Sequence, residues 1–357
     1  MFDRLPVGMK VRVCAHRFQH GTLTMAIYNG ELYGELLKSA IRTYLSEEEL
    51  QDNQYLLQVV KDALRCYFQY KVKPNEYFNF DFQNKSGEER LSYISDEERV
   101  KSLLRIEGIA GKMELRDKWK FYQKAKPFFK REVFHLTSQT ELSDFSSFVM
   151  NIRYVFCKPN TGAMGEGIHS FEVNDEDGAK TIFHSLLSEC DDWVVEERIV
   201  QSEPMREWNE SSINTVRFPS FLKDGMFTPF YPKLRVGRSG EVVDNFAKGG
   251  MIAMIDAATG TITTNAYTKD KKQFKSHPDS GKIFMNAQIP DWEELLGLVE
   301  KIHRTMPQQI YVAWDLAHTS KGWDIVEANW GQLGSTQMML GHGVKNQFYS
   351  MMGYNQG

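Results

Sequence analysis

The stretch "GWDIVEANWG" (residues 322–331) decides how the C-terminal part of the chain folds. Its isoleucine, valine and alanine lie between two glycines, a pattern that predicts a β-strand. Because side chains alternate along a strand, Ile325, Glu327 and Asn329 are expected to share one face. The sequence therefore predicts a largely buried strand that presents a carboxylate and an amide on one side.

A second polar strand is predicted just before it. "YVAWDLAH" (residues 311–318) reads as a strand that carries Asp315, and the short segment "HTSKG" (residues 318–322) allows a hairpin back into the first strand. If the two strands pair, Asp315, Glu327 and Asn329 converge on one oxygen-rich spot.

Two interpretations of this spot remain open. Oxygen ligands without thiols or imidazoles suit Mg²⁺, which keeps several water ligands and relies on substrate phosphates. The alternative is a set of solvated polar side chains on an exposed sheet face. The other motifs of the chain favour the magnesium site.

A glycine-bearing turn follows a predicted strand in "FCKPNTGAMGEGI" (residues 156–168). Lys158 ends the strand, and Gly162, Gly165 and Gly167 follow. Glycines let backbone N–H groups approach phosphate oxygens, and a neighbouring lysine neutralises charge. The segment lacks the Walker A pattern, and a strand rather than a helix follows it, which argues against a dinucleotide fingerprint. It predicts a phosphate-binding loop, with an ordinary hairpin loop as the alternative.

A candidate nucleotide edge comes next, in "WVVEERIVQSEP" (residues 193–204). An apolar strand ends in Glu196 and Glu197, and Ile199 and Glu203 follow. Such an edge can offer backbone groups to adenine while a carboxylate binds ribose hydroxyls.

An arginine and an asparagine lie near the start of the next predicted strand, in "SINTVR" (residues 212–217). Arginine is the preferred side chain for bidentate binding of phosphate or carboxylate, so Arg217 is a candidate for that role beside Asn214. The alternative for any single arginine is a surface salt bridge.

The composition sets the class of protein. The chain has 357 residues, 41% of them hydrophobic and 25% charged, and a formal net charge of -4, which is ordinary for a soluble protein and does not indicate nucleic-acid binding. Its four cysteines are scattered, as expected in a reducing compartment. We find neither a signal-peptide core nor an apolar run long enough to span a membrane. A cytoplasmic enzyme or binding protein is expected.

The pattern of periodicities predicts an α+β fold with a helical N-terminal region. Residues 30–116 have helical periodicity, and capping boxes are expected at Ser46 and Ser95. One long helix is expected to begin at the Ser46 capping box. Strands and helices then alternate, and strands dominate beyond residue 211. A further helix is expected to begin at Asp291, with that residue as its N-cap.

Taken in order, these motifs resemble the ATP-grasp enzymes. More narrowly, "LRDKWKFYQ", "FCKPNTGAMGEGI", "EERIVQ", "SSINTVRF", "DNFAKGG" and "IVEANWG" resemble the branch associated with sugar transfer and polysaccharide synthesis, which includes teichuronopeptide-type ligases. "KPNEYFNFDF" and "GEERLSYIS" in the helical region are similar to that branch too. The resemblance spans roughly residues 71–334.

The resemblance implies a fold in which two α+β subdomains enclose an ATP cleft. It implies a mainly helical region over residues 1–112, a small subdomain with the glycine-rich loop over residues 113–195, and a large subdomain with the metal site over residues 196–357. A helical region stands where a Rossmann-like domain often precedes this fold, so substrates of better-known ligases are not carried over.

The resemblance also implies roles for single residues. Lys118 and Lys158 would contact the nucleotide, and the loop from Thr161 to Gly167 would close over its phosphates. Adenine would bind backbone groups of Glu197 and Ile199. Ribose would bind Glu203, or alternatively Glu196 or Glu197.

The phosphoryl-transfer and acceptor residues follow from the same resemblance. Mg²⁺ would be bound by Asp315, Glu327 and Asn329. Arg217 would face the transferred phosphoryl group, with Arg235 assisting it. The residues expected around the acceptor are Asn214, Asn245, Lys248, Gly249 and Gly250.

The function implied is that of an ATP-dependent carboxylate–amine ligase that forms an amide or peptide bond through an acylphosphate. Its substrates would be a small-molecule or glycan carboxylate and an amine such as an amino acid, in polysaccharide or cell-surface glycan modification. One alternative is a kinase that uses the same cleft on a sugar or small molecule. Another is a nucleotide-binding module without turnover.

Overall fold

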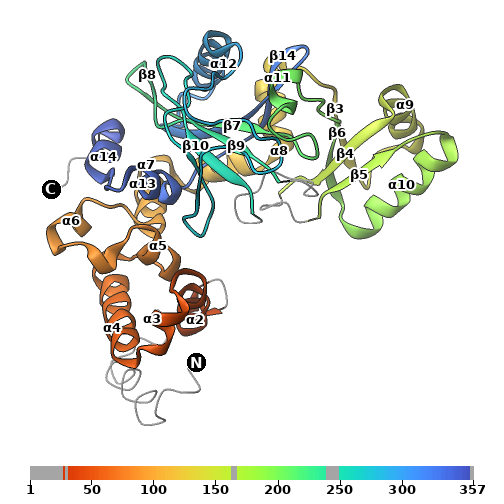
Figure 1. The fold of residues 1–357 in the computed structure, drawn as a ribbon. Helices are drawn as coiled ribbons and strands as arrows, with labels where there is room; N and C mark the ends of the chain where they lie inside the picture. The colour runs from red at the N-terminus through yellow and green to blue at the C-terminus, as the bar shows by residue number, and fades with distance from the viewer. Residues whose placement is uncertain (1–26, 29–30, 162–166, 239–248, 354–357) are drawn as a thin grey trace.

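The structure, a computed structural model, describes residues 27–28, 31–161, 167–238 and 249–353. A helical region, a four-stranded sheet and an eight-stranded sheet succeed one another along the chain (Figure 1). The large sheet lies between the helical region and the small sheet. The predicted α+β class with a helical N-terminal region is thereby confirmed. Among the described residues, no helix combines the length and the apolar character needed to cross a lipid bilayer.

The helical region has its own aromatic-rich core, which extends from Tyr33 to Tyr93. Its elements are β1 (Ile27–Tyr28), β2 (Glu31–Leu32), α2 (Tyr33–Tyr44), α3 (Glu47–Gln51), α4 (Asn53–Tyr70), α5 (Pro74–Asn79), η3 (Phe82–Asn84), α6 (Gly87–Leu91) and α7 (Asp96–Arg116).

The predicted capping box at Ser46 is confirmed, but it opens only a short helix. Asp52 interrupts the expected long helix because its backbone is extended and its carboxylate caps α4, accepting from the amides of Gln54 and Tyr55. At Ser95 the hydroxyl accepts from the Glu98 amide and caps α7. The Glu98 carboxylate binds Tyr349 and Lys345, so only the first half of a capping box forms there.

Helix α7 connects the helical region to the large sheet. Gly108 breaks it with a φ of 70°, a conformation that favours glycine. Just before this break, the Glu107 carboxylate accepts hydrogen bonds from the amides of Ile310 (2.9 Å) and Tyr311 (3.0 Å), where β13 begins. Burial raises the pKa of Glu107 to about 7. A neutral carboxyl therefore joins α7 to the sheet at acidic pH.

This junction predicts a pH dependence of stability. A carboxyl whose pKa rises on folding stabilises the folded state at low pH, and that contribution is lost as the pH rises towards about 7. We expect Glu107→Gln, which stays neutral, to match the wild type at pH 5. At pH 8 we expect it to exceed the wild type by up to about 2 kcal/mol in the free energy of unfolding.

Urea unfolding at the two pH values measures the difference. Glu97→Gln is the matched control, since Glu97 lies on the same helix and pairs with Lys101 at the surface. A difference between Glu107→Gln and the wild type that does not change with pH would refute the assignment.

The small sheet has the order β3-β6-β4-β5 and is antiparallel throughout. Helix α8 (Lys118–Ala125) and η4 (Lys126–Phe128) lead into it. Its strands are β3 (Val133–Thr137), β4 (Tyr154–Pro159), β5 (His169–Glu172) and β6 (Asp192–Glu197), and its helices are α9 (Leu142–Ile152) and α10 (Glu176–Glu189). The glycine-rich segment connects β4 to β5, so the prediction that a strand follows it is confirmed.

The large sheet has the order β12-β11-β10-β9-β7-β13-β14, with β8 paired to β7. Its strands are β7 (Thr215–Lys223), β8 (Met226–Pro229), β9 (Lys233–Val236), β10 (Met251–Met254), β11 (Ala266–Tyr267), β12 (Gln273–Phe274), β13 (Tyr311–Thr319) and β14 (Gly322–Asn329). The helices of this part are α11 (Glu203–Arg206), α12 (Trp292–Arg304), α13 (Gly334–Leu340) and α14 (Lys345–Met352).

The expected N-cap of α12 is wrong in its details. Asp291 precedes the helix but has a left-handed backbone and makes no side-chain cap. Its carboxylate instead binds His318 Nε2 on β13 at 2.9 Å, so it ties the start of the helix to the sheet.

The predicted hairpin of β13 and β14 is confirmed, and its register contains a bulge. Asp315 pairs with Glu327 and Leu316 pairs with Ile325, so Val326 is an extra residue on β14. The extra residue turns Ile325 to the opposite face, and the expectation that Ile325 shares a face with Glu327 is wrong. Asn329 keeps the face of Glu327 because the ladder is regular beyond the bulge.

Candidate active site

A buried aspartate held by two arginines lies on β13, next to the edge strand β14 of the large sheet. Strand β13 pairs with β7 so that Asp315 opposes Arg217. Arg217 donates from Nε to Asp315 Oδ1 at 2.7 Å and from Nη2 to Oδ2 at 2.6 Å. Arg235 on β9 donates from Nη1 to Oδ2 at 2.9 Å. Burial raises the pKa of Asp315, but the two guanidinium groups outweigh it and hold that pKa well below its ordinary value.

Glu327 lies directly opposite Asp315 on β14. Burial and the neighbouring Asp315 carboxylate raise the pKa of Glu327. Asn329 pairs with Ala313 two register positions further along and donates from Nδ2 to Glu327 Oε1 at 3.3 Å. The structure therefore brings the three expected metal ligands together on one face of the hairpin.

These donors fit a hard divalent cation. Two adjacent carboxylates repel each other, as the raised pKa of Glu327 shows, and a cation between them would remove that repulsion. Two carboxylates and an amide oxygen are a typical incomplete set for Mg²⁺. In the described part of the chain no three His, Cys, Asp or Glu side chains cluster as metal ligands, and both Asp315 oxygens are bound by arginines.

Two lysines from the small-sheet side lie near this cluster. Lys118, at the start of α8, donates to the carbonyl oxygens of Pro159 (2.8 Å) and Asn160 (3.2 Å). Lys158 on β4 is buried and donates to Glu196 Oε2 at 2.9 Å. Burial lowers the pKa of Lys118, and the nearby charge of Lys158 lowers it further, while Glu327 acts in the opposite direction. The two lysines and the polar face of β14 therefore lie within electrostatic range of one another.

The glycine-rich loop is described only at its ends. Thr161 is exposed, and its carbonyl accepts from Arg116 at 3.3 Å. Gly167 has a φ of 67°, which explains a glycine there. Gly162 and Gly165 lie outside the described residues.

The edge expected to bind adenine and ribose follows β6. Glu196 is buried, and its Oε2 is engaged by both Lys158 and Arg131. The Glu197 amide donates to the Glu132 carbonyl at 2.9 Å and is therefore used inside the protein. Ile199 lies half-buried beyond the strand end.

Glu203 begins α11 and is exposed. Its only recorded partner in the described part of the chain is Arg206, at 3.2 Å. A weak surface pair of this kind leaves the carboxylate free to bind another group.

The residues expected around the acceptor are only partly described. Asn214 is fully buried, and its Nδ2 donates to Gln201, Met205 and Asn209. These contacts brace the chain before β7, so the structure gives Asn214 an internal role rather than a substrate-facing one.

The remaining acceptor candidates lie before β10. Gly249 is exposed with a φ of 96°, and Gly250 is buried. Asn245 and Lys248 lie outside the described residues.

The sequence did not single out Lys233 on β9. It is 2% exposed, pairs with Arg217 on the neighbouring strand β7, and donates to Thr336 Oγ1 at 2.6 Å. Burial lowers its pKa to about 7, and Arg217 and Arg235 contribute. The sequence feature that could have identified Lys233 is its spacing from Arg235: the two lie two positions apart on one strand and therefore share a face.

Arg131 was also missed. It lies just before β3, is buried, and joins Glu196 of the small sheet to Asp324 of the large sheet. A lone arginine outside every recognised motif gives no sequence signal of this kind.

The model of the sugar-transfer associated ATP-grasp family matches residues 113–351. The matched part therefore contains both sheets and excludes most of the helical region, to which the sequence resemblance extended. No curated protein sequence matches the chain significantly.

Solved structures with similar folds include ligases at low identity. D-alanyl-alanine synthetase A from Vibrio cholerae is 11% identical, with a TM-score of 0.42, over 68% of this chain and 65% of that one. VanG D-Ala:D-Ser ligase from Enterococcus faecalis is 17% identical, with a TM-score of 0.42, over 70% and 63%. N5-carboxyaminoimidazole synthase from Aspergillus clavatus is 10% identical, with a TM-score of 0.39, over 63% and 46%. The chain thus spans between about half and two thirds of the length of these three proteins.

Proposed function

Because the chain belongs to the sugar-transfer associated ATP-grasp family, we propose that it is an ATP-dependent ligase that joins a carboxylate to an amine. The observation that carries the proposal is the cluster of Arg217, Arg235 and Lys233 around Asp315, next to Glu327. A buried lysine and two partly buried arginines on the neighbouring strands β7 and β9 suit a reaction in which anions must be held and neutralised.

The chemistry needs charge neutralisation more than a protein nucleophile. The acceptor carboxylate attacks the γ-phosphorus of ATP, ADP leaves, and an acylphosphate forms. The amine then attacks the acyl carbon, phosphate leaves, and an amide results. Arg217 and Arg235 would offset charge on the transferring phosphoryl group, and Lys233 would help to hold the anionic acceptor.

The nucleotide would lie between the two sheets. Lys118 and Lys158 would bind its phosphates, beneath the loop that starts at Thr161. Adenine would bind the backbone near Ile199, and Glu203 is our proposed ribose ligand. Asp315, Glu327 and Asn329 would hold Mg²⁺, which when bound neutralises the β- and γ-phosphate oxygens.

The site favours a carboxylate acceptor over a hydroxyl acceptor. A kinase that phosphorylates a hydroxyl benefits from a base that takes the proton. Asp315 is engaged by two arginines, and Glu327 is a proposed metal ligand, so neither is free for that role. A carboxylate is already an anionic nucleophile and needs no such base.

The acceptor is proposed to be a sugar acid, an amino acid or a peptide, in polysaccharide or cell-surface glycan modification. The description of the family supports a role linked to sugar transfer. A cytoplasmic location is part of the proposal, since ATP is abundant there and Cys66, Cys157 and Cys190 are free thiols.

Product analysis tests the reaction type. With ATP, a panel of sugar acids and amino acids, and Mg²⁺, we expect equal amounts of ADP, phosphate and an amide of the combined mass. Omitting the amine should stop net turnover or allow only slow acylphosphate hydrolysis. A stable phosphorylated product without amide would establish the kinase instead, and ATP binding without any product would establish a non-catalytic module.

A further inference from the structure

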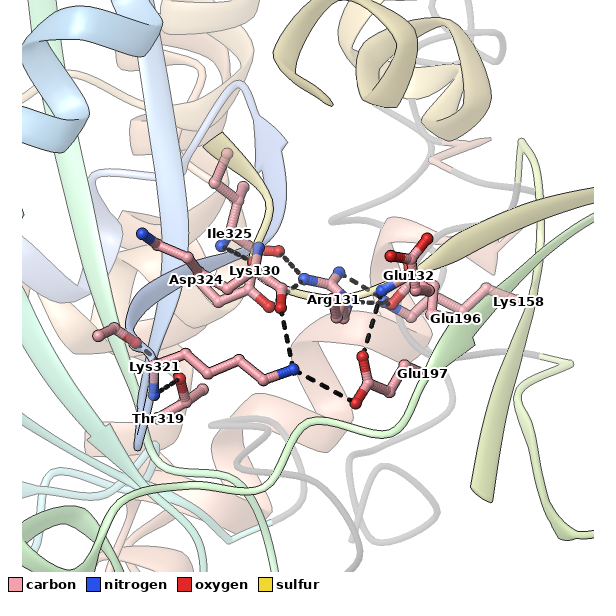
Figure 2. Close-up of polar contacts among 11 residues, drawn as sticks. Lys130, Arg131, Glu132, Lys158, Glu196, Glu197, Thr319, Lys321, Asp324 and Ile325 are labelled. Atoms are coloured by element: carbon pink, nitrogen blue, oxygen red, sulfur yellow. Dashed lines mark hydrogen bonds and ion pairs between the residues drawn. The ribbon is translucent and has the colours of Figure 1, made fainter. Parts of the chain in front are cut away.

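A buried arginine outside the proposed catalytic cluster joins the two sheets (Figure 2). Arg131 donates from Nε (3.2 Å) and Nη2 (2.9 Å) to Glu196 Oε2 on β6. Its Nη1 lies 2.8 Å from Asp324 Oδ2 and donates to the Ile325 carbonyl on β14. The side chain is only 3% exposed, so these contacts are made away from water.

The same Glu196 oxygen also accepts from Lys158, at 2.9 Å. Arg131 and Lys158 therefore compete for Oε2, and Figure 2 shows both side chains directed at Glu196. Asp324, which is 1% exposed, balances the second positive charge. The four side chains form a buried group with no net charge.

The balance of positive and negative charge among these four side chains determines how tightly Glu196 holds Lys158. When two cations share one carboxylate oxygen, each is bound less strongly than it would be alone. Without Arg131, Glu196 would bind Lys158 alone and the group would carry a net negative charge. Without the charge of Asp324, Arg131 would turn more fully to Glu196 and the group would carry a net positive charge.

We propose that Arg131 is a positioning residue that shares Glu196 with Lys158 and so leaves the lysine charge available to the nucleotide phosphates. The inference rests on the proposed function, in which Lys158 contacts ATP. Through Asp324 and Ile325, Arg131 also ties the nucleotide side of the site to β14 just before Glu327.

An exposed lysine makes a parallel connection that serves as the control. Lys321, in the β13–β14 turn, lies 3.6 Å from Glu197 Oε1 and donates to the Lys130 carbonyl at 3.4 Å. Its side chain is 61% exposed, so water screens this ion pair. Lys321→Met should therefore leave ATP affinity within about twofold of the wild type.

Two charge changes of opposite sign test the proposal, with dissociation constants for ATP and for adenosine measured by calorimetry on the full chain. Arg131→Met should weaken ATP binding roughly tenfold, because Lys158 is then held by Glu196 alone. Asp324→Asn keeps the shape of the side chain and should leave ATP binding unchanged or tighter. Adenosine lacks phosphates, so its affinity should stay within about twofold in both variants.

A purely structural brace predicts a different pattern. Both variants would then weaken ATP and adenosine binding together, in step with their loss of stability, and that result would overturn the inference. In the double variant Arg131→Met with Asp324→Asn, Glu196 still binds Lys158 alone, so its ATP affinity should stay close to that of Arg131→Met, and full recovery would overturn the role of the shared oxygen. Where Arg131→Met does not fold, Arg131→Lys keeps the charge without the paired contacts, and a loss of adenosine affinity equal to its loss of ATP affinity would overturn the proposal.

The outcomes also separate this inference from the proposed function. A wild-type chain that does not bind ATP would overturn both. A wild-type chain that binds ATP and makes the amide, with equal losses of ATP affinity in the two single variants, would overturn the role of Arg131 alone.

Discussion

Replacing Glu327 by glutamine is expected to reduce turnover by about a thousandfold while leaving the fold intact. Glutamine keeps the size of the side chain but removes one of the two carboxylates proposed to hold Mg²⁺. The fold should tolerate the change, because burial and the Asp315 charge already raise the pKa of Glu327. A neutral glutamine at this position removes the repulsion between the two carboxylates. Thermal unfolding should therefore be unchanged or shifted upwards.

The measurement is the rate of ADP release over a range of magnesium concentrations. Glu300→Gln is the control, since Glu300 forms an exposed pair with Arg304 far along α12 and should have wild-type activity within about twofold. Full activity of Glu327→Gln at ordinary magnesium concentration would contradict the metal assignment.

Replacing Arg217 by methionine is expected to lower kcat by about a hundredfold or more, with a smaller change in the KM for ATP. Arg217 is the only residue in the described part of the chain that binds both Asp315 oxygens, and it is proposed to face the transferring phosphoryl group. Charge that develops during transfer would then lose one of the cations proposed to offset it. Arg217→Lys should recover little, because an ammonium group cannot make the paired contact.

Steady-state kinetics with varied ATP separates the two constants. Arg304→Met, at the surface of α12, removes an arginine without touching the site and should behave as the wild type. A change confined to the KM for ATP would contradict a role in phosphoryl transfer and make Arg217 a ground-state binding residue.

The sequence predicted the C-terminal hairpin well because local patterns determine it. Alternating residues, a short polar connection and a glycine at residue 322 specify two antiparallel strands. Asp315, Glu327 and Asn329 accordingly lie together on one face. The ATP-grasp resemblance is also confirmed, by a family match that covers most of the same motifs.

The bulge at Val326 shows the limit of strand periodicity. A strict period of two placed Ile325 beside Glu327, whereas the structure pairs it with Leu316 on the opposite face. Nothing in the local pattern distinguishes a regular strand from one with an extra residue, because both keep apolar and polar residues in similar proportions.

Contacts between distant segments were the least predictable. Asp315 meets Arg217 because β13 lies next to β7, although five other described strands separate the two along the chain. Arg131 reaches Ile325 across 194 positions, and no motif contains it. The sequence therefore predicted candidate residues, while the pairing of their charges needed the sheet order.

The most direct test is a crystal structure of the protein with a non-hydrolysable ATP analogue and Mn²⁺, which replaces Mg²⁺ and gives an anomalous signal. We expect an anomalous peak roughly 2.2 Å from oxygens of Glu327 and of Asp315 or Asn329, beside the β- and γ-phosphates. Asp315 should then have exchanged at least one arginine contact for the ion. A nucleotide bound elsewhere, or an ion distant from β13 and β14 with both arginines still on Asp315, would contradict the proposed site.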